Sequence, residues 1–427
     1  MDKIARVVIV GAGQAGALAA ATLRQLGYRG ALTLIGQEPH PPYERPPLSK
    51  AVLLGDDAAD AQTAIHPPAF YGEQDITLIT GATVVALEPD DGKLRLDDGR
   101  VMPYDRCLLA TGGAARELAG LPRGTPGVHY IRTLDDARAL RRAVLPGTRL
   151  GVIGGGFLGL EIASTATGMG ATATVIEGAP RLLQRALPEA LSHWLAQRAQ
   201  AQGVSLHLGA AVQATQAPSP GQPARIILAD GATIEADLLA VTIGLTPATA
   251  LAARAGLLLD PANGGIAVDA HCRTSDSHVY AAGDCTSQHH TFLGTAARLE
   301  SWQNACEQAR VAAASMLGLA LPAPAYPWFW TDQFGCNVQI LGTPAAGLEY
   351  VCRGDADPTA DAPRGLWLGH REGVPVHGIA INAGTDLRQL RVLFERRLPL
   401  DTAAFADPAI PLKPLVKASQ QAAALAR

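Results

Sequence analysis

The stretch Arg6-Val7-Val8-Ile9-Val10-Gly11-Ala12-Gly13-Gln14-Ala15-Gly16 decides the fold of this chain. Residues 7–10 form the short, continuous apolar run that is typical of a strand buried on both faces. The glycines after it permit a tight turn, close approach of backbone to a pyrophosphate, and tight packing of a helix on a strand. Residues 17–25 predict that helix, and residues 31–35 predict the next strand. The result is a βαβ unit with Gly11, Gly13, Gln14, Ala15 and Gly16 at the phosphates of a dinucleotide.

A second glycine fingerprint, Gly154-Gly155-Gly156-Phe157-Leu158-Gly159, follows a second apolar run at 149–153. A helix is expected at 160–168 and a strand at 172–176. Two complete fingerprints predict two dinucleotide sites, the second using Gly154, Gly156, Phe157, Leu158 and Gly159.

Side chains that can hydrogen-bond a ribose hydroxyl stand where each predicted site needs them. Gln37 and Glu38 follow the second strand of the first site, and Glu177 lies 23 positions after Gly154 in the second. A carboxylate at residue 177 can bond both ribose hydroxyls and would repel a 2′-phosphate, which favours NADH over NADPH. Arg181 and Arg185 lie nearby and could instead accommodate that phosphate.

The composition predicts a soluble, multidomain cytoplasmic protein. A chain of 427 residues holds two or three domains, and its net charge of -4 gives no overall attraction to nucleic acid or acidic membranes. The N-terminus lacks the layout of a signal peptide, and no apolar run is long enough to span a membrane. The six cysteines show no C-x-x-C or zinc spacing, so no metal site and no redox pair is expected.

The segment Tyr43-Glu44-Arg45-Pro46-Pro47-Leu48-Ser49-Lys50 is rigid and cationic. It could be a proline-rich surface loop, or a wall that places Arg45 and Lys50 against a flavin. It resembles the signature of the ferredoxin reductases of bacterial oxygenase systems, which are FAD- and NADH-dependent relatives of glutathione reductase. The resemblance implies an α/β fold with two Rossmann-like domains, for FAD and NAD, and an α+β C-terminal interface domain. The expected domains are residues 1–112 with 246–322 for FAD, 113–245 for NAD, and 323–427 for the interface.

The resemblance also implies roles for single residues. Lys50 is expected beside the nicotinamide with Glu161, whose alternative role is that of an acid favourable at a helix N-terminus. Trp330 is expected to cover the flavin on the side of the protein partner, although such an aromatic cluster is more often plain core. Trp302, on a helix expected at 298–305, stands where relatives usually carry a smaller residue. The remaining cofactor contacts implied are Val84 at the adenine end, Asp284 at the ribityl chain, Arg132 and Gly244.

The implied activity is hydride transfer from NADH to FAD, followed by single-electron transfer to a [2Fe–2S] ferredoxin, or a rubredoxin, that feeds an oxygenase. Lys50, Glu161 and Trp330 are the candidate catalytic residues of a monomer or weak dimer. Two alternatives stay open. An NADH oxidase or another pyridine nucleotide reductase would normally need a cysteine near the flavin, where this chain has Pro42 and Tyr43. A non-catalytic, NADH-sensing flavoprotein would reduce ferredoxin poorly.

The chain from Ala380 onward is basic, although the whole chain is acidic. It carries seven lysines and arginines against four acidic residues. Together with Arg310, this tail is a candidate docking surface for an acidic ferredoxin. The alternative is an ordinary solvated helix face.

Overall fold

The computed structural model describes residues 4–425, which divide into two compact units. The first unit contains the described residues up to Pro46, then Asp57–Ala114 and Leu245–Ala325. The second unit contains Pro47–Asp56, Ala115–Gly244 and the described residues from Tyr326 onward. The short segment that carries Lys50 thus belongs with the second unit, although the chain on either side of it belongs with the first. The division into three domains remains a prediction.

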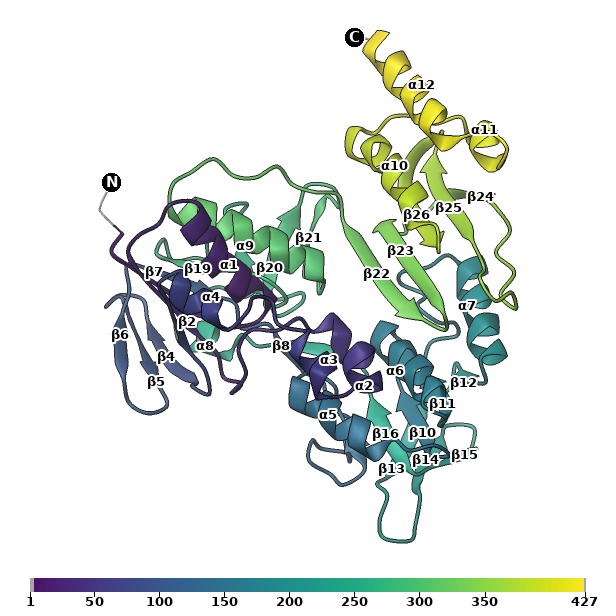
Figure 1. The fold of residues 1–427 in the computed structure, drawn as a ribbon, viewed down its shortest axis with the longest axis horizontal. Coiled ribbons are helices and arrows are strands. Elements are labelled where there is room, and N and C mark those ends of the chain that lie inside the picture. The colour runs from purple at the N-terminus through teal and green to yellow at the C-terminus, as the bar shows by residue number, and fades with distance from the viewer. Residues whose placement is uncertain (1–3, 426–427) are drawn as a thin grey trace. The chain divides into compact units, whose positions relative to one another are not determined.

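The first unit is built on a parallel five-stranded sheet in the order β19-β7-β1-β2-β3 (Figure 1). Its strands are β1 (Arg6–Val10), β2 (Ala31–Ile35), β3 (Ile76–Ile79), β7 (Arg106–Leu109) and β19 (Val279–Ala281). Strand β1 pairs with β2 on one side and β7 on the other, and its apolar residues are buried. This is the arrangement that the continuous apolar run predicts.

Helices α1 (Gln14–Gln25) and α9 (Trp302–Met316) share one apolar core with this sheet. Alanines occupy many of their buried positions, among them Ala17, Ala20 and Ala309. Small side chains let the two helix backbones approach closely, which fixes both helix N-termini relative to the sheet. The other elements of this unit are α3 (Asp57–Ala61), α4 (Ala69–Glu73), α8 (Ala250–Arg254), β4 (Val84–Glu88), β5 (Lys93–Leu96), β6 (Val101–Pro103), β18 (Ile266–Val268), β20 (Thr286–His290) and β21 (Thr295–Ala297).

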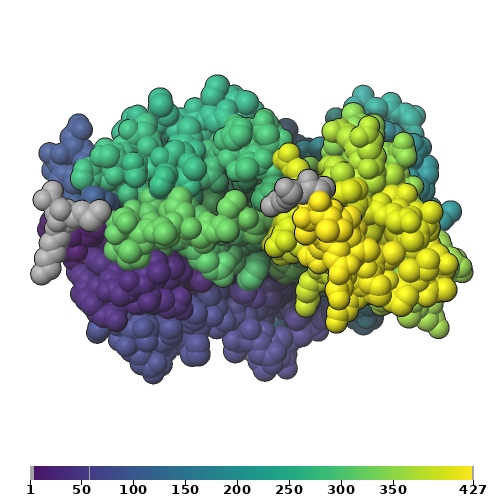
Figure 2. All heavy atoms as spheres, turned by 90° about the horizontal axis from the view of Figure 1, so that it is seen from above, coloured from purple at the N-terminus to yellow at the C-terminus, as the bar shows by residue number. Residues whose placement is uncertain are grey.

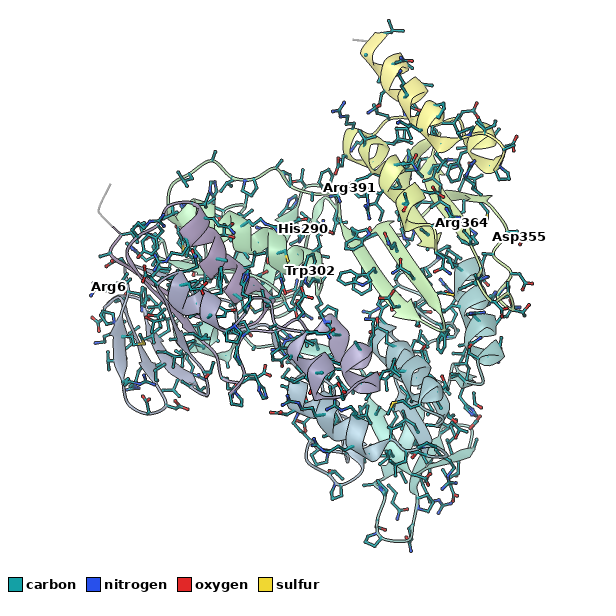
Figure 3. All side chains as sticks on the ribbon, in the orientation of Figure 1. Arg6, His290, Trp302, Asp355, Arg364 and Arg391 are labelled. Carbon is teal, nitrogen blue, oxygen red and sulfur yellow. The ribbon has the colours of Figure 1, made fainter. Side chains whose placement is uncertain are left out.

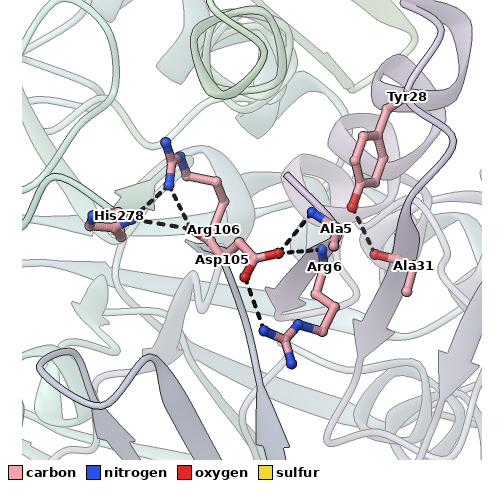
Figure 4. A network of polar contacts seen from close by, with 7 residues as sticks. All are labelled: Ala5, Arg6, Tyr28, Ala31, Asp105, Arg106 and His278. Carbon is pink, nitrogen blue, oxygen red and sulfur yellow. Dashed lines mark hydrogen bonds and ion pairs between the residues drawn. The ribbon is translucent and has the colours of Figure 1, made fainter. Parts of the chain in front are cut away.

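A polar network fastens the N-terminal ends of the central strands (Figure 4). The Asp105 carboxylate accepts hydrogen bonds from the backbone N–H groups of Ala5 and Arg6, at 2.8 and 2.7 Å, and from the Arg6 guanidinium at 3.1 Å. Burial acts to raise the pKa of Asp105, but these hydrogen bonds outweigh it and the pKa is lowered. Arg106 lies 2.6 Å from His278, which precedes β19. The network therefore joins the starts of β1, β7 and β19.

The second unit contains another parallel sheet, in the order β12-β11-β10-β16-β9. Its strands are β9 (Val128–His129), β10 (Arg149–Ile153), β11 (Thr172–Glu177), β12 (Ser205–Leu208) and β16 (Leu238–Val241). Around it lie η1 (Pro46–Ser49), α2 (Ala51–Leu54), α5 (Leu134–Ala143), α6 (Phe157–Gly168), α7 (Glu189–Ala201), and an antiparallel sheet of β13 (Val212–Gln216), β14 (Ala224–Leu228) and β15 (Thr233–Ala236). The chain passes between the units at β8 (Gly113–Ala115) and β17 (Leu245–Pro247), and also at 46–47, 56–57 and 325–326.

The C-terminal part of the second unit is an antiparallel sheet in the order β22-β23-β26-β25-β24, followed by helices. The strands are β22 (Trp328–Gln333), β23 (Cys336–Gly342), β24 (Glu349–Arg353), β25 (Gly365–Arg371) and β26 (Val374–Ile381). The helices are α10 (Gly384–Arg396), α11 (Thr402–Ala406) and α12 (Leu412–Leu425), and this C-terminal part of the chain, yellow in Figure 2, lies at the molecular surface. The fold class predicted from the sequence, two Rossmann-like domains and an α+β C-terminal domain, is confirmed.

Helix starts are where the sequence-based expectation was wrong. Helices α1 and α6 begin at Gln14 and Phe157, earlier than residues 17 and 160, because each follows its N-cap glycine directly. The helix expected at 298–305 begins only at Trp302, because the Ser301 hydroxyl accepts the N–H of Asn304 and caps it. Among residues 4–425, no helix combines the length and hydropathy needed to cross a membrane.

Acid sensitivity is expected from a histidine inside the C-terminal sheet. His377 is fully buried, its Nδ1 lies 2.7 Å from the Tyr350 hydroxyl, and burial lowers its pKa from 6.5 to about 4. Between these values the unfolded chain binds a proton that the folded chain does not, so stability present at pH 7 is lost as the pH falls. The loss by pH 4 is expected to be about 3 kcal/mol. Urea unfolding of the wild type and of His377→Gln checks this, since the variant should lack that part of the pH dependence. Parallel pH profiles would contradict it.

Candidate functional site

The first glycine fingerprint has the geometry of a dinucleotide cradle. Gly11 has φ +111°, and a Cβ there would lie 2.1 Å from the Ala110 carbonyl oxygen. A Cβ on Gly16 would lie 1.9 Å from the Gly11 carbonyl oxygen, so only glycine allows α1 to pack this closely. A Cβ on Gly13 would meet nothing within 4 Å. The space at Gly13 is where a phosphate can approach the backbone.

The second fingerprint repeats this geometry in the second unit. Gly154 has φ +110°, and a Cβ there would lie 2.5 Å from the Thr242 carbonyl oxygen. A Cβ on Gly159 would lie 2.0 Å from the Gly154 carbonyl oxygen, while one on Gly156 would meet nothing within 4 Å. Gly154, Gly156 and Gly159 therefore serve the same three purposes as Gly11, Gly13 and Gly16, and both stretches fit a bound pyrophosphate.

Both cradles end at an uncapped helix N-terminus. Gly13 and Gly156 are the N-caps of α1 and α6, and neither helix has a side-chain cap in the described structure. Their first N–H groups and the positive end of the helix dipole are thus directed toward the cradle, as phosphate binding requires. Gln14 donates to the Cys306 sulfur at 3.3 Å, while its buried Oε1 has no partner among the described residues. Ala15 is buried in the first turn of α1 and Leu158 lies in that of α6. The Phe157 ring lies 4.5 Å from the Phe329 ring.

Two residues of the proline-rich segment hydrogen-bond to Glu38, the predicted ribose ligand of the first unit. Glu38 follows β2, and its carboxylate is bonded by the Tyr43 hydroxyl and by the Arg45 guanidinium at 2.7 Å. Burial acts to lower the pKa of Arg45, but the attraction of neighbours that include Glu38 and Asp284 outweighs it, and the pKa is raised. Arg45 is therefore a fixed cation in this cluster. Gln37 is exposed.

Asp284, Trp302 and Val84 also lie in the first unit. Asp284 is half-buried a few residues beyond the end of β19. The Trp302 indole, at the start of α9 (Figure 3), donates to the Glu44 carboxylate at 3.2 Å. The larger side chain is thus anchored to the proline-rich segment. Val84 is buried at the first position of β4. Their contacts with FAD remain predictions.

Glu177 is fixed beside the second cradle by backbone donors. Its Oε2 accepts from the Gly155 N–H and its Oε1 from the Ala179 N–H, both at 2.7 Å. Each oxygen retains acceptor capacity for a ribose hydroxyl. Arg181 donates to the Leu187 carbonyl oxygen and the Ser192 hydroxyl, both at 2.9 Å, so its guanidinium is held by the loop before α7 and by α7 itself. Arg185 is exposed.

This arrangement predicts a preference for NADH. A 2′-phosphate would face the fixed Glu177 carboxylate, and NADPH would lose a ribose bond. The expected preference in kcat/KM is at least about tenfold, because leaving buried polar groups unpaired costs about 1–3 kcal/mol. Steady-state rates with ferricyanide and either nucleotide measure it. Glu177→Ala should reduce the preference and Arg181→Gln should leave it unchanged. Equal wild-type efficiency with both nucleotides would contradict the prediction.

A buried polar cluster in the second unit surrounds Glu161. The Lys50 ammonium lies 2.9 Å from Glu161 Oε1, which brings together the two residues paired by the sequence analysis. Thr331 donates to the same oxygen at 2.6 Å, and Ser49 donates to Oε2 at 2.5 Å. The contacts of Ser49 and Thr331 with Glu161 were not predicted from the sequence. Their position next to Lys50 and Trp330 was the only local signal.

The other predicted residues of the second unit lie in different surroundings. Trp330 is half-buried on β22, and its ring stacks on the Trp328 ring at 5.0 Å. Gly244 has φ +110° and open space at its Cβ position. The Arg132 backbone N–H donates to the Asp136 carboxylate beside the cap of α5. Roles for Trp330, Gly244 and Arg132 at a cofactor remain predictions.

The fold and the two cradles define a class of flavoproteins that carry two dinucleotide sites in one chain. Comparison with known proteins places this chain in the same class. Residues 5–309 match the pyridine nucleotide-disulphide oxidoreductase family, and residues 328–416 match the reductase C-terminal family. The chain belongs to the pyridine nucleotide-disulphide oxidoreductase family. The cofactors predicted from the sequence, FAD and NADH, and the predicted class of FAD-dependent oxidoreductase are thereby confirmed. All six cysteines are free, and none lies in residues 41–50.

The similar proteins include reductases of oxygenase systems. The ferredoxin–NAD(+) reductase component of the anthranilate 1,2-dioxygenase system of Burkholderia cepacia is 40% identical over 95% of this chain and 98% of its own length. A rubredoxin–NAD(+) reductase of Pseudomonas putida is 39% identical over 79% of this chain and 86% of its own. Among solved structures, the covalent putidaredoxin reductase–putidaredoxin complex gives a TM-score of 0.90 at 34% identity, covering 97% of this chain and 98% of that one.

Proposed function

We propose that this protein is an NADH-dependent ferredoxin reductase, which passes hydride from NADH to FAD and then single electrons to a [2Fe–2S] ferredoxin that serves an oxygenase. The main support is the pair of matched dinucleotide cradles in a chain without a cysteine at residues 41–50. Without that redox cysteine, electrons must leave without a disulfide relay. Relatives named as reductase components of dioxygenase systems support the same reading.

Each part of the chain has a distinct task in this proposal. The glycine cradles and helix N-termini hold the pyrophosphates, and Glu177 orients the ribose of NADH. Bound FAD would supply the chemistry that joins a two-electron donor to one-electron acceptors. No side chain is required as an acid or a base in hydride transfer. The Lys50–Glu161 pair would provide a fixed charge distribution for that step, and Trp330 would line the side from which electrons leave.

Steady-state reduction of candidate acceptors by NADH tests the proposal. A [2Fe–2S] ferredoxin should be reduced with a kcat/KM far above that of molecular oxygen. Rubredoxin is a second candidate acceptor, favoured by the similar rubredoxin reductase. Rapid reduction of oxygen would instead favour an oxidase. A solved NADH oxidase structure is similar to this chain, but at 18% identity the likeness shows the fold alone. A long-lived complex with NADH and slow reduction of every acceptor would favour a sensing role.

The C-terminal helices supply a candidate docking surface for an acidic ferredoxin. Arg388, Arg396 and Arg397 are exposed on or next to α10. Arg391, labelled in Figure 3, is bonded to Glu395 at 2.7 Å on the same helix, which reduces its own contribution. Arg310 is exposed on α9 in the first unit, so its part in docking is a separate prediction.

Ferredoxin reduction is expected to slow as salt rises, because charges are screened over about 8 Å at physiological ionic strength. Arg388→Glu should raise the KM for ferredoxin by about two- to fivefold, as expected for an exposed charge that steers association. Arg391→Glu should raise the KM less, because Arg391 is already paired with Glu395. Arg225→Glu, an exposed site on β14 at the other end of the second unit in Figure 1, is the matched control. NADH–ferricyanide rates should stay nearly constant in all three. If ferricyanide and ferredoxin rates fall together, those arginines maintain the fold and docking lies elsewhere.

A further inference from the structure

The Glu161 carboxylate has more partners than its pairing with Lys50 requires. Oε1 is shared by the Lys50 ammonium at 2.9 Å and the Thr331 hydroxyl at 2.6 Å, while Oε2 takes the Ser49 hydroxyl at 2.5 Å. Thr331 is 0% exposed, Ser49 2% and Glu161 7%. Water does not reach these hydroxyls freely, so loss of either hydrogen bond would not readily be replaced by solvent.

The direction of the Thr331 hydrogen bond is set by its other neighbour. Gln333 Nε2 is a donor and lies 3.4 Å from Thr331 Oγ1, and the Glu161 carboxylate is an acceptor only. The single hydroxyl proton of Thr331 therefore goes to Glu161 Oε1. This bond acts on the oxygen that Lys50 also uses.

Strand β22 is held to helix α6 at a second point that does not involve Glu161. The Phe334 N–H, just beyond β22, donates to the Ser164 hydroxyl at 2.6 Å, one helical turn from Glu161. The backbone carbonyl oxygen of Ser49 likewise accepts a hydrogen bond from the Thr165 hydroxyl of α6 at 2.7 Å. The strand is thus docked by the Phe334–Ser164 bond, while the carboxylate is oriented by the Thr331–Glu161 bond. Different variants can remove the two bonds separately.

We propose that Thr331 is a positioning residue, whose hydroxyl orients the Glu161 carboxylate and thereby holds the Lys50 ammonium in place. Ser49 fixes the second oxygen and prevents rotation of the carboxylate. Strand β22 of the C-terminal domain thereby sets the geometry of a pair that belongs to the segments around residues 50 and 161. Thr331 acts through Glu161 and is not itself catalytic. The consequence for electron transfer rests on the proposed function of Lys50, but the positioning does not.

Lysine acetylation of the FAD-free protein tests the positioning directly. The chain has only five lysines, and half-buried Lys93, bonded to Glu88 and Asp91, is an internal reference. Thr331→Val removes the hydroxyl at nearly constant volume and should raise acetylation of Lys50 relative to Lys93 by about tenfold, as expected for loss of a hydrogen bond to a charged group. Thr331→Ser should restore the wild-type rate. Ser164→Ala, which removes only the docking bond, should leave the ratio unchanged.

The holoenzyme gives a second readout. Thr331→Val should slow flavin reduction by NADH in stopped flow, but not further in a Lys50→Met background, because both act on one unit. Additive slowing in the double variant, unchanged labelling in Thr331→Val, or equal labelling changes in Ser164→Ala would overturn the proposal. If Thr331→Val does not fold, Thr331→Ala carries the same test. Changed labelling with normal reduction in Lys50→Met would keep the positioning and refute the proposed role of Lys50.

Discussion

Replacing Gly13 with valine is expected to give a folded protein that no longer retains FAD. A Cβ at Gly13 would meet no protein atom within 4 Å, and its φ of -84° suits any residue, so the folded chain tolerates the change. Valine at an N-cap costs about 1 kcal/mol. The same side chain would fill the space that a pyrophosphate needs beside the first N–H groups of α1. Losing two such bonds at about 1.5–3 kcal/mol each weakens FAD binding by at least about 100-fold.

The equivalent change in the second cradle should leave FAD bound and weaken the binding of NADH. Gly156 also has an open Cβ position and a φ of -76°. Gly156→Val is expected to be yellow, to be reduced by dithionite, and to show a KM for NADH raised by at least about 100-fold for the same reason. Flavin stoichiometry, NADH titration and thermal unfolding, compared with FAD-free wild type, distinguish the two variants.

Gly16→Ala and Gly159→Ala are the matched controls for these changes. A Cβ at either position would lie within 2.0 Å of a backbone oxygen, so these variants should lose stability before they lose any one cofactor. If Gly13→Val instead retained FAD with wild-type affinity, the first fingerprint would not be the pyrophosphate site.

Lys50→Met is expected to retain FAD and to slow its reduction by NADH by about 10- to 100-fold. Removing one preorganised electrostatic contact often costs about 100-fold or more. The side chain of Lys50 is 20% exposed, and the resulting screening places the expected effect toward the lower end. Stopped-flow reduction followed at the flavin absorbance measures it, with single-turnover conditions separating reduction from NADH binding.

Glu161→Gln should slow the same step, because the carbonyl oxygen of glutamine still accepts one bond but carries no full charge. Lys93→Met removes a half-buried, paired lysine of the first unit and should have no effect. Unchanged reduction in both Lys50→Met and Glu161→Gln would reduce the pair to a structural ion pair.

Local sequence alone determined the two cradles. The glycine positions could be predicted because each has a short-range constraint: a positive φ at Gly11 and Gly154, and backbone contact within a few residues at Gly16 and Gly159. The further close approach of Ala110 to Gly11 and of Thr242 to Gly154 comes from distant strands. The apolar runs at 7–10 and 149–153 likewise specify buried parallel strands by their own composition. Glu177 could be placed because its distance along the chain from Gly154 is fixed by one βαβ unit.

Only the tertiary structure decided the surroundings of Lys50. Ser49 and Glu161 are separated by 112 positions, and Glu161 and Thr331 by 170, so no local pattern brings them together. The start of α9 also differed from expectation, because capping by Ser301 outweighed the helical pattern that precedes it. The glycine spacing of a cradle can be predicted because it is set largely by local backbone geometry. The partners of a buried carboxylate depend instead on which distant segments pack against it.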